Sequence, residues 1–539
     1  MRTGRIKRIT GTVLSFIMCI TMFCGCSFSD KRQNFHDDEN IIDDKYGNCY
    51  QIFVYSFCDS NGDGIGDLNG ITSKLDYIKD LGFTSIWLSP IHKASTYHKY
   101  DVIDYYSIDS KYGTMEDFEA LVAACDELGI DIYMDYVINH TSARHEWFVK
   151  AKEYLATLSY AEDIDVSVCP YADYYNFEMR DSCPSGWAKV PNTDNWYYEC
   201  VFWDQMPDLN LYNEEVRKEI ERNVDFWIEK GVKGFRLDAA LHFVEGNTTE
   251  STEILKWFVD YVKSVDENLY CVAEVWSSLS TLESFYESGI DSLFNFNFGN
   301  KDGLLCSAVK KSGNGEAGKK LTDNVVKMYE TFKAINPDYV DGVFASNHDT
   351  GRLAGFLGRD LNKLKLAAGI QLMQTGCVFV YYGEELGMVG SGADENKRAP
   401  MYWSDEEVDY ATNGPPNYQK QEHVFGSYET QKDDKYSLYN YYRNALHIRN
   451  KYPAIGRGVP AAMDDVTAQN GNIYAVSKTY NDEKLCILFN NSDTEITVTV
   501  SKDTYGYEKI TDTLTVSDEK PSISGESITI PGYCGVILQ

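Results

Sequence analysis

The sequence predicts a (β/α)8 barrel with an inserted domain after its third strand and a C-terminal antiparallel β-sandwich. Three observations predict this fold class. Eight short apolar runs follow one another along most of the chain, with helical stretches between most of them. Several runs end in polar residues, which is where barrels of this kind place their active sites. Beyond Gly458 the pattern changes to short alternating strands with Gly, Asn and Asp turns.

The barrel strands are predicted from apolar runs, because parallel strands buried on both faces carry apolar residues almost continuously. They lie near residues 50–57, 84–89, 132–138, 233–238, 270–275, 291–296, 342–346 and 377–383. Helical candidates cover residues 71–81, 115–128, 213–230, 250–265 and 361–374. This alternation favours a closed barrel over a doubly wound sheet.

The connection after the third strand is too long for an ordinary loop. It runs from about Thr141 to Met206 and is rich in Tyr, Asp and Trp. A connection of this length should fold as a domain of its own. We therefore predict a catalytic barrel over 46–140 and 207–457, an inserted domain over 141–206 and a sandwich domain over 458–539.

The N-terminus has the pattern of a secretory signal. Four basic residues precede an apolar run from about Ile9 to Phe23, which is shorter than a comfortable membrane span. The run ends in Phe-Cys-Gly-Cys and resembles a bacterial lipobox, which implies cleavage and lipidation at Cys26. We expect a signal peptide over 1–26, a flexible tether over 27–45 and a cell-surface lipoprotein. Simple secretion and a retained membrane anchor are the alternatives.

Composition limits the partners. A chain of 539 residues with 43% hydrophobic residues is too long for one ordinary domain and can bury a large core. The formal net charge of −32 argues against nucleic acid and anionic membrane surfaces. Forty Tyr, 25 Phe and 9 Trp suit a carbohydrate binder, although core filling must explain most of them.

The cysteines do not form a disulfide framework. Of the 14 cysteines, three lie in the signal region, and the other eleven are scattered and odd in number. Buried free thiols are the favoured interpretation, and a bond among Cys169, Cys183 and Cys200 is the alternative.

Two carboxylates, Asp238 and Glu274, lie at the ends of predicted neighbouring strands, where they could act together as acid and base. Arg236 and Asp238 are two residues apart on a predicted strand and should share a face, so the guanidinium should lower the pKa of Asp238. Glu274 ends the next run among apolar neighbours, where burial should raise its pKa. A retaining glycosidase needs one ionised and one protonated carboxyl group. Taken alone, the Arg236–Asp238 pair could also be an ordinary structural contact.

Four segments, in order, resemble the conserved regions of the α-amylase family, glycoside hydrolase family 13. They are Asp135–His140, Gly234–Ala239, Glu274–Trp276 and Phe344–Asp349, and the likeness covers almost everything after residue 46. The resemblance implies that Asp238 is the nucleophile, Glu274 the general acid/base and Asp349 a transition-state stabiliser. It also implies that the sugar is bound by His98, Tyr100, His140, Arg236 and His348.

The segment after the first strand predicts a calcium site. It offers alternating oxygen ligands and copies the first nine positions of an EF-hand loop, but its twelfth position is Gly70 rather than Glu. The ligands would be Asp59, Asn61, Asp63, the Ile65 carbonyl and Asp67. A Gly-rich turn with solvated acids is the alternative. The resemblance implies a second calcium site formed by Asn139, Asp208 and the His242 carbonyl.

Specificity is predicted from three positions. The segment from Met206 to Asn210 resembles members between the oligo-1,6-glucosidase and neopullulanase groups, several of them lipid-anchored or secreted bacterial α-amylases. Ala239 resembles enzymes that act on α-1,4 bonds, whereas Leu241 departs from the Lys of many α-amylases. We expect a monomeric α-amylase that cleaves internal α-1,4-glucosidic bonds in starch and maltooligosaccharides.

Three alternatives stay open. A neopullulanase or an exo-acting α-glucosidase would use the same fold. A surface starch-binding protein with a weak catalytic site is disfavoured because all three acids are present. A calcium-binding adhesion module would explain only residues 59–67.

Overall fold

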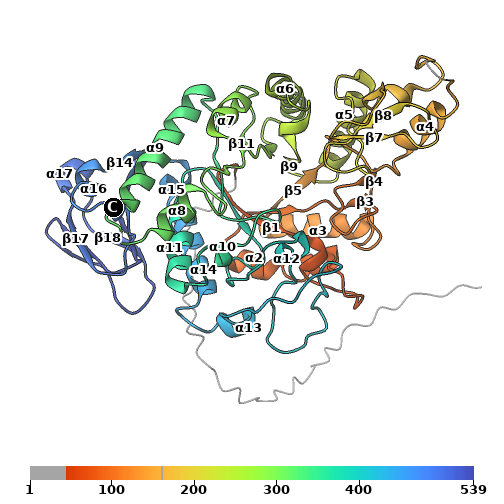
Figure 1. Cartoon of the computed structure of the whole chain (residues 1–539). Coiled ribbons are helices and arrows are strands. Elements are labelled where there is room, and N and C mark those ends of the chain that lie inside the picture. Colours follow the sequence, from red (N-terminus) through yellow and green to blue (C-terminus); the bar gives the residue numbers. More distant parts are fainter. Residues whose placement is uncertain (1–43, 160–161) are drawn as a thin grey trace, which may run out of the picture. The chain divides into compact units, whose positions relative to one another are not determined.

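The computed structural model describes residues 44–159 and 162–539 (Figure 1). The predicted signal peptide, Cys26 and most of the predicted tether lie outside the described residues. Among the helices of the described part, none combines the length and the apolar character needed to cross a bilayer.

Eight parallel strands form the centre of the fold and confirm the predicted barrel. They pair in the order β11-β10-β9-β5-β2-β1-β13-β12, and a bridge between Phe294 and Gly342 joins the two ends of this order. The strands are β1 (Asn48–Ile52), β2 (Ser85–Leu88), β5 (Asp131–Tyr136), β9 (Gly234–Leu237), β10 (Tyr270–Ala273), β11 (Ser292–Leu293), β12 (Gly342–Phe344) and β13 (Cys377–Tyr381).

Every predicted apolar run overlaps one of these strands, but the first run continues beyond its strand. β1 ends at Ile52, and the chain turns into a short 3₁₀ helix over Val54–Ser56. Phe53, Val54 and Phe57 are fully buried, so the apolar run continues because the turn lies in the core.

The predicted helices are present at the expected places. α3 illustrates why: Thr114 and Asp117 form a capping box at its start, and its buried side chains recur on one face. The predicted set corresponds to α1 (Leu68–Thr72) with α2 (Leu75–Leu81), α3 (Met115–Leu128), α5 (Glu214–Glu229), α6 (Thr248–Val265) and α11 (Leu361–Leu372). Longer helices outside that set are α4 (Glu146–Leu155), α7 (Leu279–Tyr286), α8 (Leu304–Lys310), α9 (Ala317–Ile335) and α14 (Leu438–Lys451).

Two smaller sheets follow the second and third barrel strands. The connection after β2 contains a hairpin of β3 (His92–Ala94) and β4 (Val102–Ile108), which the sequence analysis did not predict. The connection after β5 contains α4 and an antiparallel sheet in the order β6-β8-β7. Its strands are β6 (Phe177–Met179), β7 (Trp187–Lys189) and β8 (Trp196–Glu199). The predicted domain boundaries stay predictions.

The C-terminal region consists of two antiparallel sheets. The five-stranded sheet has the order β14-β15-β16-β21-β18 and the three-stranded sheet the order β17-β20-β19. Their strands are β14 (Val459–Ala462), β15 (Ile473–Tyr480), β16 (Glu483–Asn490), β17 (Ile496–Thr499), β18 (Ile510–Leu514), β19 (Ser522–Ser524), β20 (Ser527–Ile530) and β21 (Gly535–Leu538).

The central strand β16 is buried on both faces. Leu488 packs in a core that includes Val498 and Ile528 of the smaller sheet. Its neighbours Ile487 and Phe489 belong instead to the large core that contains the barrel. Side chains alternate between the faces of a strand, so the five-stranded sheet joins two cores.

All eleven cysteines of the described part are free thiols, which confirms the favoured interpretation. Cys183 is exposed and the other ten are buried.

Candidate active site

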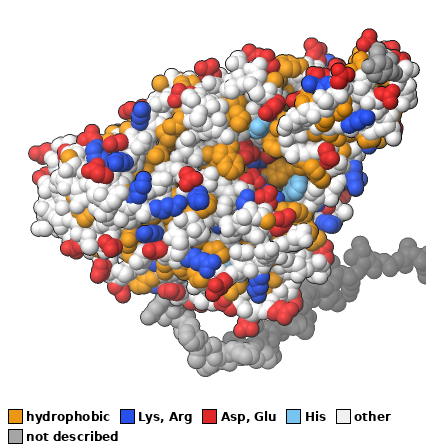
Figure 2. All heavy atoms as spheres, viewed as in Figure 1, with side chains coloured by type: hydrophobic (Ala, Val, Ile, Leu, Met, Phe, Trp, Pro, Cys, Tyr) orange, Lys and Arg blue, Asp and Glu red, His pale blue; other side chains and the backbone are white. Residues whose placement is uncertain are grey.

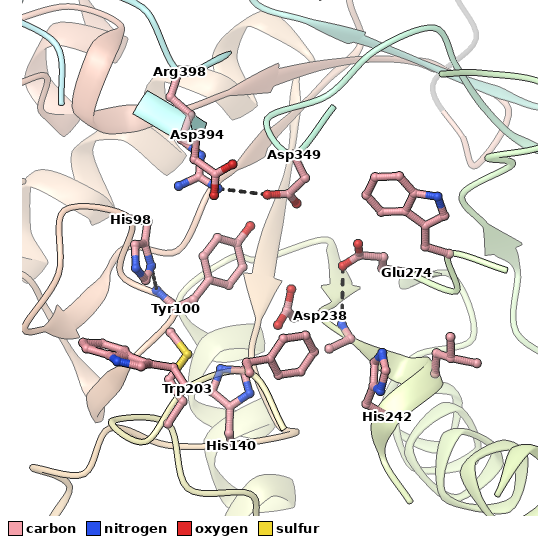
Figure 3. A pocket seen from close by; sticks show the side chains of 15 residues that line it. His98, Tyr100, His140, Trp203, Asp238, His242, Glu274, Asp349, Asp394 and Arg398 are labelled. Carbon is pink, nitrogen blue, oxygen red and sulfur yellow. Dashed lines mark hydrogen bonds and ion pairs between the residues drawn. The ribbon is translucent and has the colours of Figure 1, made fainter. Parts of the chain in front are cut away.

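A cavity of about 570 Å³ opens at the carboxyl ends of the barrel strands (Figure 3). In the space-filling view, acidic and histidine side chains gather around one hollow (Figure 2). The cavity is lined by His98, Tyr100, His140, Phe202, Trp203, Met206, Asp238, Ala239, Leu241, His242, Glu274, Trp276, Asp349, Asp394 and Arg398. The three predicted catalytic acids therefore face one shared space.

One buried arginine joins two of these acids. Arg236 lies on β9 and is fully buried; its Nη1 donates to Asp238 Oδ1 at 2.6 Å, and its Nη2 donates to Glu274 Oε2 at 2.6 Å. Asp238 and Glu274 each follow directly after a strand, and those strands, β9 and β10, are paired neighbours. The register of the parallel sheet thus brings both carboxyl groups to one guanidinium.

The third acid has its own cationic partners. Asp349 Oδ2 lies 2.9 Å from His348 Nε2, and Asp349 Oδ1 accepts from Arg398 Nη2 at 2.9 Å (Figure 3). Arg398 also donates to Asp394 at 3.3 Å and to the Tyr97 hydroxyl at 2.8 Å. These contacts fix the Asp349 carboxylate at the cavity wall.

Burial and ion pairing push the three acids apart in pKa. Burial raises the pKa of Glu274 to about 7, although Arg236 lowers it. Burial also raises the pKa of Asp349, but His348 and Arg398 outweigh burial and hold it well below its usual range. For Asp238, burial outweighs the lowering by Arg236 and leaves the pKa raised. The predicted depression of the Asp238 pKa is therefore wrong, because the strand end is buried more deeply than the sequence pattern indicates.

Three of the predicted sugar-binding residues line the cavity, and two do not. His98, Tyr100 and His140 face it, and the buried Nε2 of His140 has no hydrogen-bond partner within the described chain. Arg236 and His348 are fully buried beneath the cavity and contact its lining from behind. The predicted role of these two residues in sugar binding stays a prediction.

The predicted calcium loop is wrapped around one carboxylate. Asp59 Oδ1 accepts from the backbone N–H of Asn61 and Gly62, and Asp59 Oδ2 from that of Gly64. Gly62 and Gly64 have φ of 82° and 84°, a region that favours glycine. At the loop's end, Asp67 accepts from Asn61 Nδ2 at 3.3 Å.

The donor set of this loop suits calcium, because carboxylate, amide and carbonyl oxygens are its preferred ligands. Within the described residues no three His, Cys, Asp or Glu side chains are grouped as a metal site, so calcium would depend on the Asn61 and Ile65 oxygens as well. For the second predicted site, Asn139 Nδ2 donates to Asp208 Oδ1 at 3.1 Å, and both residues are buried. The His242 side chain contacts Glu245 and lines the cavity.

The cavity also contains residues that the site prediction did not include. Phe202 and Trp203 come from the inserted region and are 48% and 46% exposed, and Trp276 after β10 is 46% exposed. Asp394 reaches the cavity through its contact with Arg398. The adjacent aromatic pair in a Tyr- and Trp-rich connection was the available sequence signal for the first two.

The chain is similar to several known proteins. The family profile described as "Alpha amylase, catalytic domain" matches residues 51–458. The chain is 39% identical over 445 residues to Alpha-amylase 3 of Dictyoglomus thermophilum, which covers 82% of this chain and 84% of that protein. It is 28% identical over 533 residues to the oligo-1,6-glucosidase of Bacillus cereus, covering 82% and 89%. The solved structure of Eubacterium rectale Amy13B matches with a TM-score of 0.89 at 40% identity, covering 93% of this chain and 96% of that one.

Proposed function

The chain belongs to the α-amylase family and is a glycoside hydrolase, and from this premise we propose that it cleaves internal α-1,4-glucosidic bonds of starch and maltooligosaccharides with retention. The observation that carries the proposal is the placement of Asp238 and Glu274 on the two Nη atoms of Arg236, facing one cavity with Asp349. Two neighbouring carboxyl groups are what double displacement requires.

In the first step, an Asp238 oxygen attacks the anomeric carbon while Glu274 gives its proton to the departing glycosidic oxygen. The carbon–oxygen bond breaks, and the sugar is held as an ester of Asp238. In the second step, Glu274 takes a proton from water, the water oxygen attacks the same carbon, and Asp238 leaves as a carboxylate. Two inversions at one carbon restore its configuration.

Arg236 suits these two reaction steps because the negative charge moves between two of its carboxylate partners, Asp238 and Glu274. Asp238 carries the charge before the first step, and Glu274 carries it afterwards. Both contacts are 2.6 Å long in one guanidinium, so the charge stays paired without a movement of the arginine. Asp349, whose pKa is held low, remains ionised and faces the positive charge that develops on the sugar.

Internal cleavage is supported by aromatic residues on more than one element of the cavity wall. Trp203 and Trp276 are half exposed and offer ring faces to sugars beyond the one that is cleaved. The relative with 39% identity is called an α-amylase. The oligo-1,6-glucosidase relative keeps an exo-acting glucosidase as the second candidate.

The test is a product analysis of starch, a long maltooligosaccharide and pullulan. We expect mixed oligomers at early times from the first two substrates, and α-configured products in early NMR spectra. Glucose as the sole early product would favour the glucosidase, and an inverted product would overturn the mechanism. Glu274→Gln is the inactive control, and its unchanged melting temperature would show that the fold is intact.

We further propose that the loop of residues 59–67 binds calcium through Asp59, Asn61, Asp63, the Ile65 carbonyl and Asp67. A second ion would be held by Asn139, Asp208 and the His242 carbonyl. Hard oxygen donors at alternate positions support the first site. Removal of calcium by a chelator should lower the melting temperature, and added calcium should restore it. In Asp63→Asn the dependence should weaken; a melting temperature indifferent to chelation would contradict both sites.

We also propose that the mature protein is a monomer held at the cell surface by a lipid on Cys26. The lipobox-like Phe-Cys-Gly-Cys segment supports this. Cys26→Ser should release the protein into the medium and abolish labelling by a radioactive fatty acid. Labelling that persists in the variant would contradict the anchor.

A further inference from the structure

A fourth carboxylate lies directly beneath the acids. Asp135 is near the end of β5 and is fully buried. Its Oδ1 accepts from Arg236 Nη1 at 2.8 Å, and its Oδ2 accepts from the Tyr100 hydroxyl at 2.8 Å and from Trp87 Nε1 at 3.2 Å. All three partners are donors, and Asp135 does not line the cavity, so it cannot touch the substrate.

Two short paths connect Asp135 to all three catalytic acids. The first passes through Arg236, which also binds Asp238 and Glu274 at 2.6 Å each. The second passes through Tyr100, whose hydroxyl lies 2.6 Å from His348 Nε2. That nitrogen lies 2.9 Å from Asp349 Oδ2.

We propose that Asp135 is a positioning residue that holds Arg236 and the Tyr100–His348 pair in place, and with them the relative geometry of the three acids. This proposal rests on the proposed glycosidase function. In that function the other two partners of Arg236 change their charge, since Asp238 becomes an ester and Glu274 loses and regains a proton. Asp135 lies outside the cavity lining and reacts in neither step, so it can hold the guanidinium through the whole cycle.

The surroundings of Arg236 make such an anchor necessary. Its Nε has no hydrogen-bond partner, and the rings of Trp87 and Tyr100 lie 5.1 and 5.8 Å from its guanidinium carbon. Carboxylates therefore determine the orientation of the guanidinium. The charged and titratable groups around Asp135 are Arg236, Asp238 and Tyr100 in contact or close by, and Glu274, His348 and Asp349 behind them. Without the Asp135 charge, only Asp238 and Glu274 would orient the Arg236 guanidinium.

The experiment compares Asp135→Asn with Asp341→Asn in the full chain. Asp341 is also a desolvated aspartate beside a barrel strand, but its partner is Asn295 and it contacts none of the acids. We expect Asp135→Asn to lower kcat about 100-fold, because small misplacements of reacting groups cost this much, and to leave KM nearly unchanged. Asp341→Asn should keep the wild-type kcat.

The pH profile separates positioning from a general loss of stability. With Asp135 neutral, the Arg236 charge acts fully on Asp238 and Glu274, so the basic limb of kcat/KM should move to lower pH in Asp135→Asn and not in Asp341→Asn. A wild-type kcat and an unmoved limb in Asp135→Asn would overturn the proposal. So would an equal loss of kcat in the two variants.

Two further measurements keep the test decisive. If Asp135→Asn does not fold, Tyr100→Phe removes only the hydroxyl between Asp135 and His348; we expect a lower kcat at an unchanged melting temperature, and an unchanged kcat would overturn the proposal. If the wild type cleaves no α-glucan, the proposed function fails. Infrared titration of the Glu274 carboxyl needs no turnover and would still test the proposal. We expect the Glu274 pKa to be lower in Asp135→Asn than in the wild type, and an unchanged Glu274 pKa would overturn the proposal.

Discussion

At the scale of single residues, the chemistry depends on how one guanidinium is shared. Arg236 contacts Asp135, Asp238 and Glu274 within 2.8 Å and is itself fully buried. A single positive charge cannot keep three buried carboxyl groups ionised, and burial raises the pKa of all three. Asp349 is different because it contacts both His348 and Arg398, and Arg398 contacts only Asp394 besides it among the acids of the cavity.

In the proposed mechanism Glu274 must be protonated to donate to the leaving oxygen, and its titration therefore sets the expected pH dependence of activity. Its pKa is raised to about 7 by burial, so the protonated form persists up to neutral pH and is lost as the pH rises further. We expect kcat/KM on a maltooligosaccharide to fall about tenfold per pH unit above this value. A rate that stays constant well into the alkaline range would contradict the assignment of Glu274 as the acid.

At the scale of elements, the ends of the strands carry the polar groups and the strands themselves carry the core. Glu384 and Glu385 come after β13 and are buried, but they do not line the cavity. Glu384 accepts from the Ser346 and Tyr442 hydroxyls, and Glu385 accepts from those of Tyr50 and Tyr77. These hydroxyls pair both oxygens of Glu384 and the Oε1 of Glu385, whose Oε2 has no partner in the described chain, and they supply no positive charge.

This arrangement predicts a loss of stability with rising pH. Burial raises the pKa of Glu384 to about 7, so the protonated form is favoured in the folded state. The stability it contributes is complete below the unfolded-state pKa and is lost as pH rises through about 7, by roughly 3 kcal/mol in total.

Glu384→Gln should therefore lose less stability than the wild type between mildly acidic and mildly alkaline pH, as measured by denaturant unfolding at several pH values. Other buried acids, such as Asp341, titrate in both proteins and cancel in the comparison. Identical pH slopes for the two proteins would show that Glu384 does not carry the effect.

At the scale of the whole molecule, the C-terminal sheet and the barrel share one core. Phe489 is fully buried within it and lies against Gly369 of α11 on the barrel side. A side chain that fills such a shared space couples the two regions energetically.

Phe489→Ala should lower the free energy of unfolding by about 3–5 kcal/mol, because it opens a cavity in this shared core. We expect calorimetry to show a single transition that moves to lower temperature. Val459→Ala, at a position 56% exposed on β14, is the matched control and should have almost no effect. Two separate transitions, with only one displaced, would contradict the coupling.

Local pattern was sufficient for the barrel strands and five helical segments, and the family resemblance pointed to the three acids that line the cavity. A strand buried on both faces needs a continuous apolar run, and a polar residue at the end of that run must face the strand's carboxyl edge. These properties belong to a few neighbouring residues, so the amino-acid sequence determines them by itself. The sequence did not predict the hairpin β3–β4, because the hairpin is short and its register shifts. Both properties weaken the alternation of apolar and polar residues.

The tertiary structure alone decided how the acids share their partners. Asp135 meets Arg236 across 101 residues, and Tyr100 meets His348 across 248. The depth of burial around Asp238 and the placement of Arg236 and His348 behind the cavity depend on such long-range contacts. Burial, charge sharing and pKa are properties of the space around a group, and the chain creates that space only when its distant strands close into a barrel.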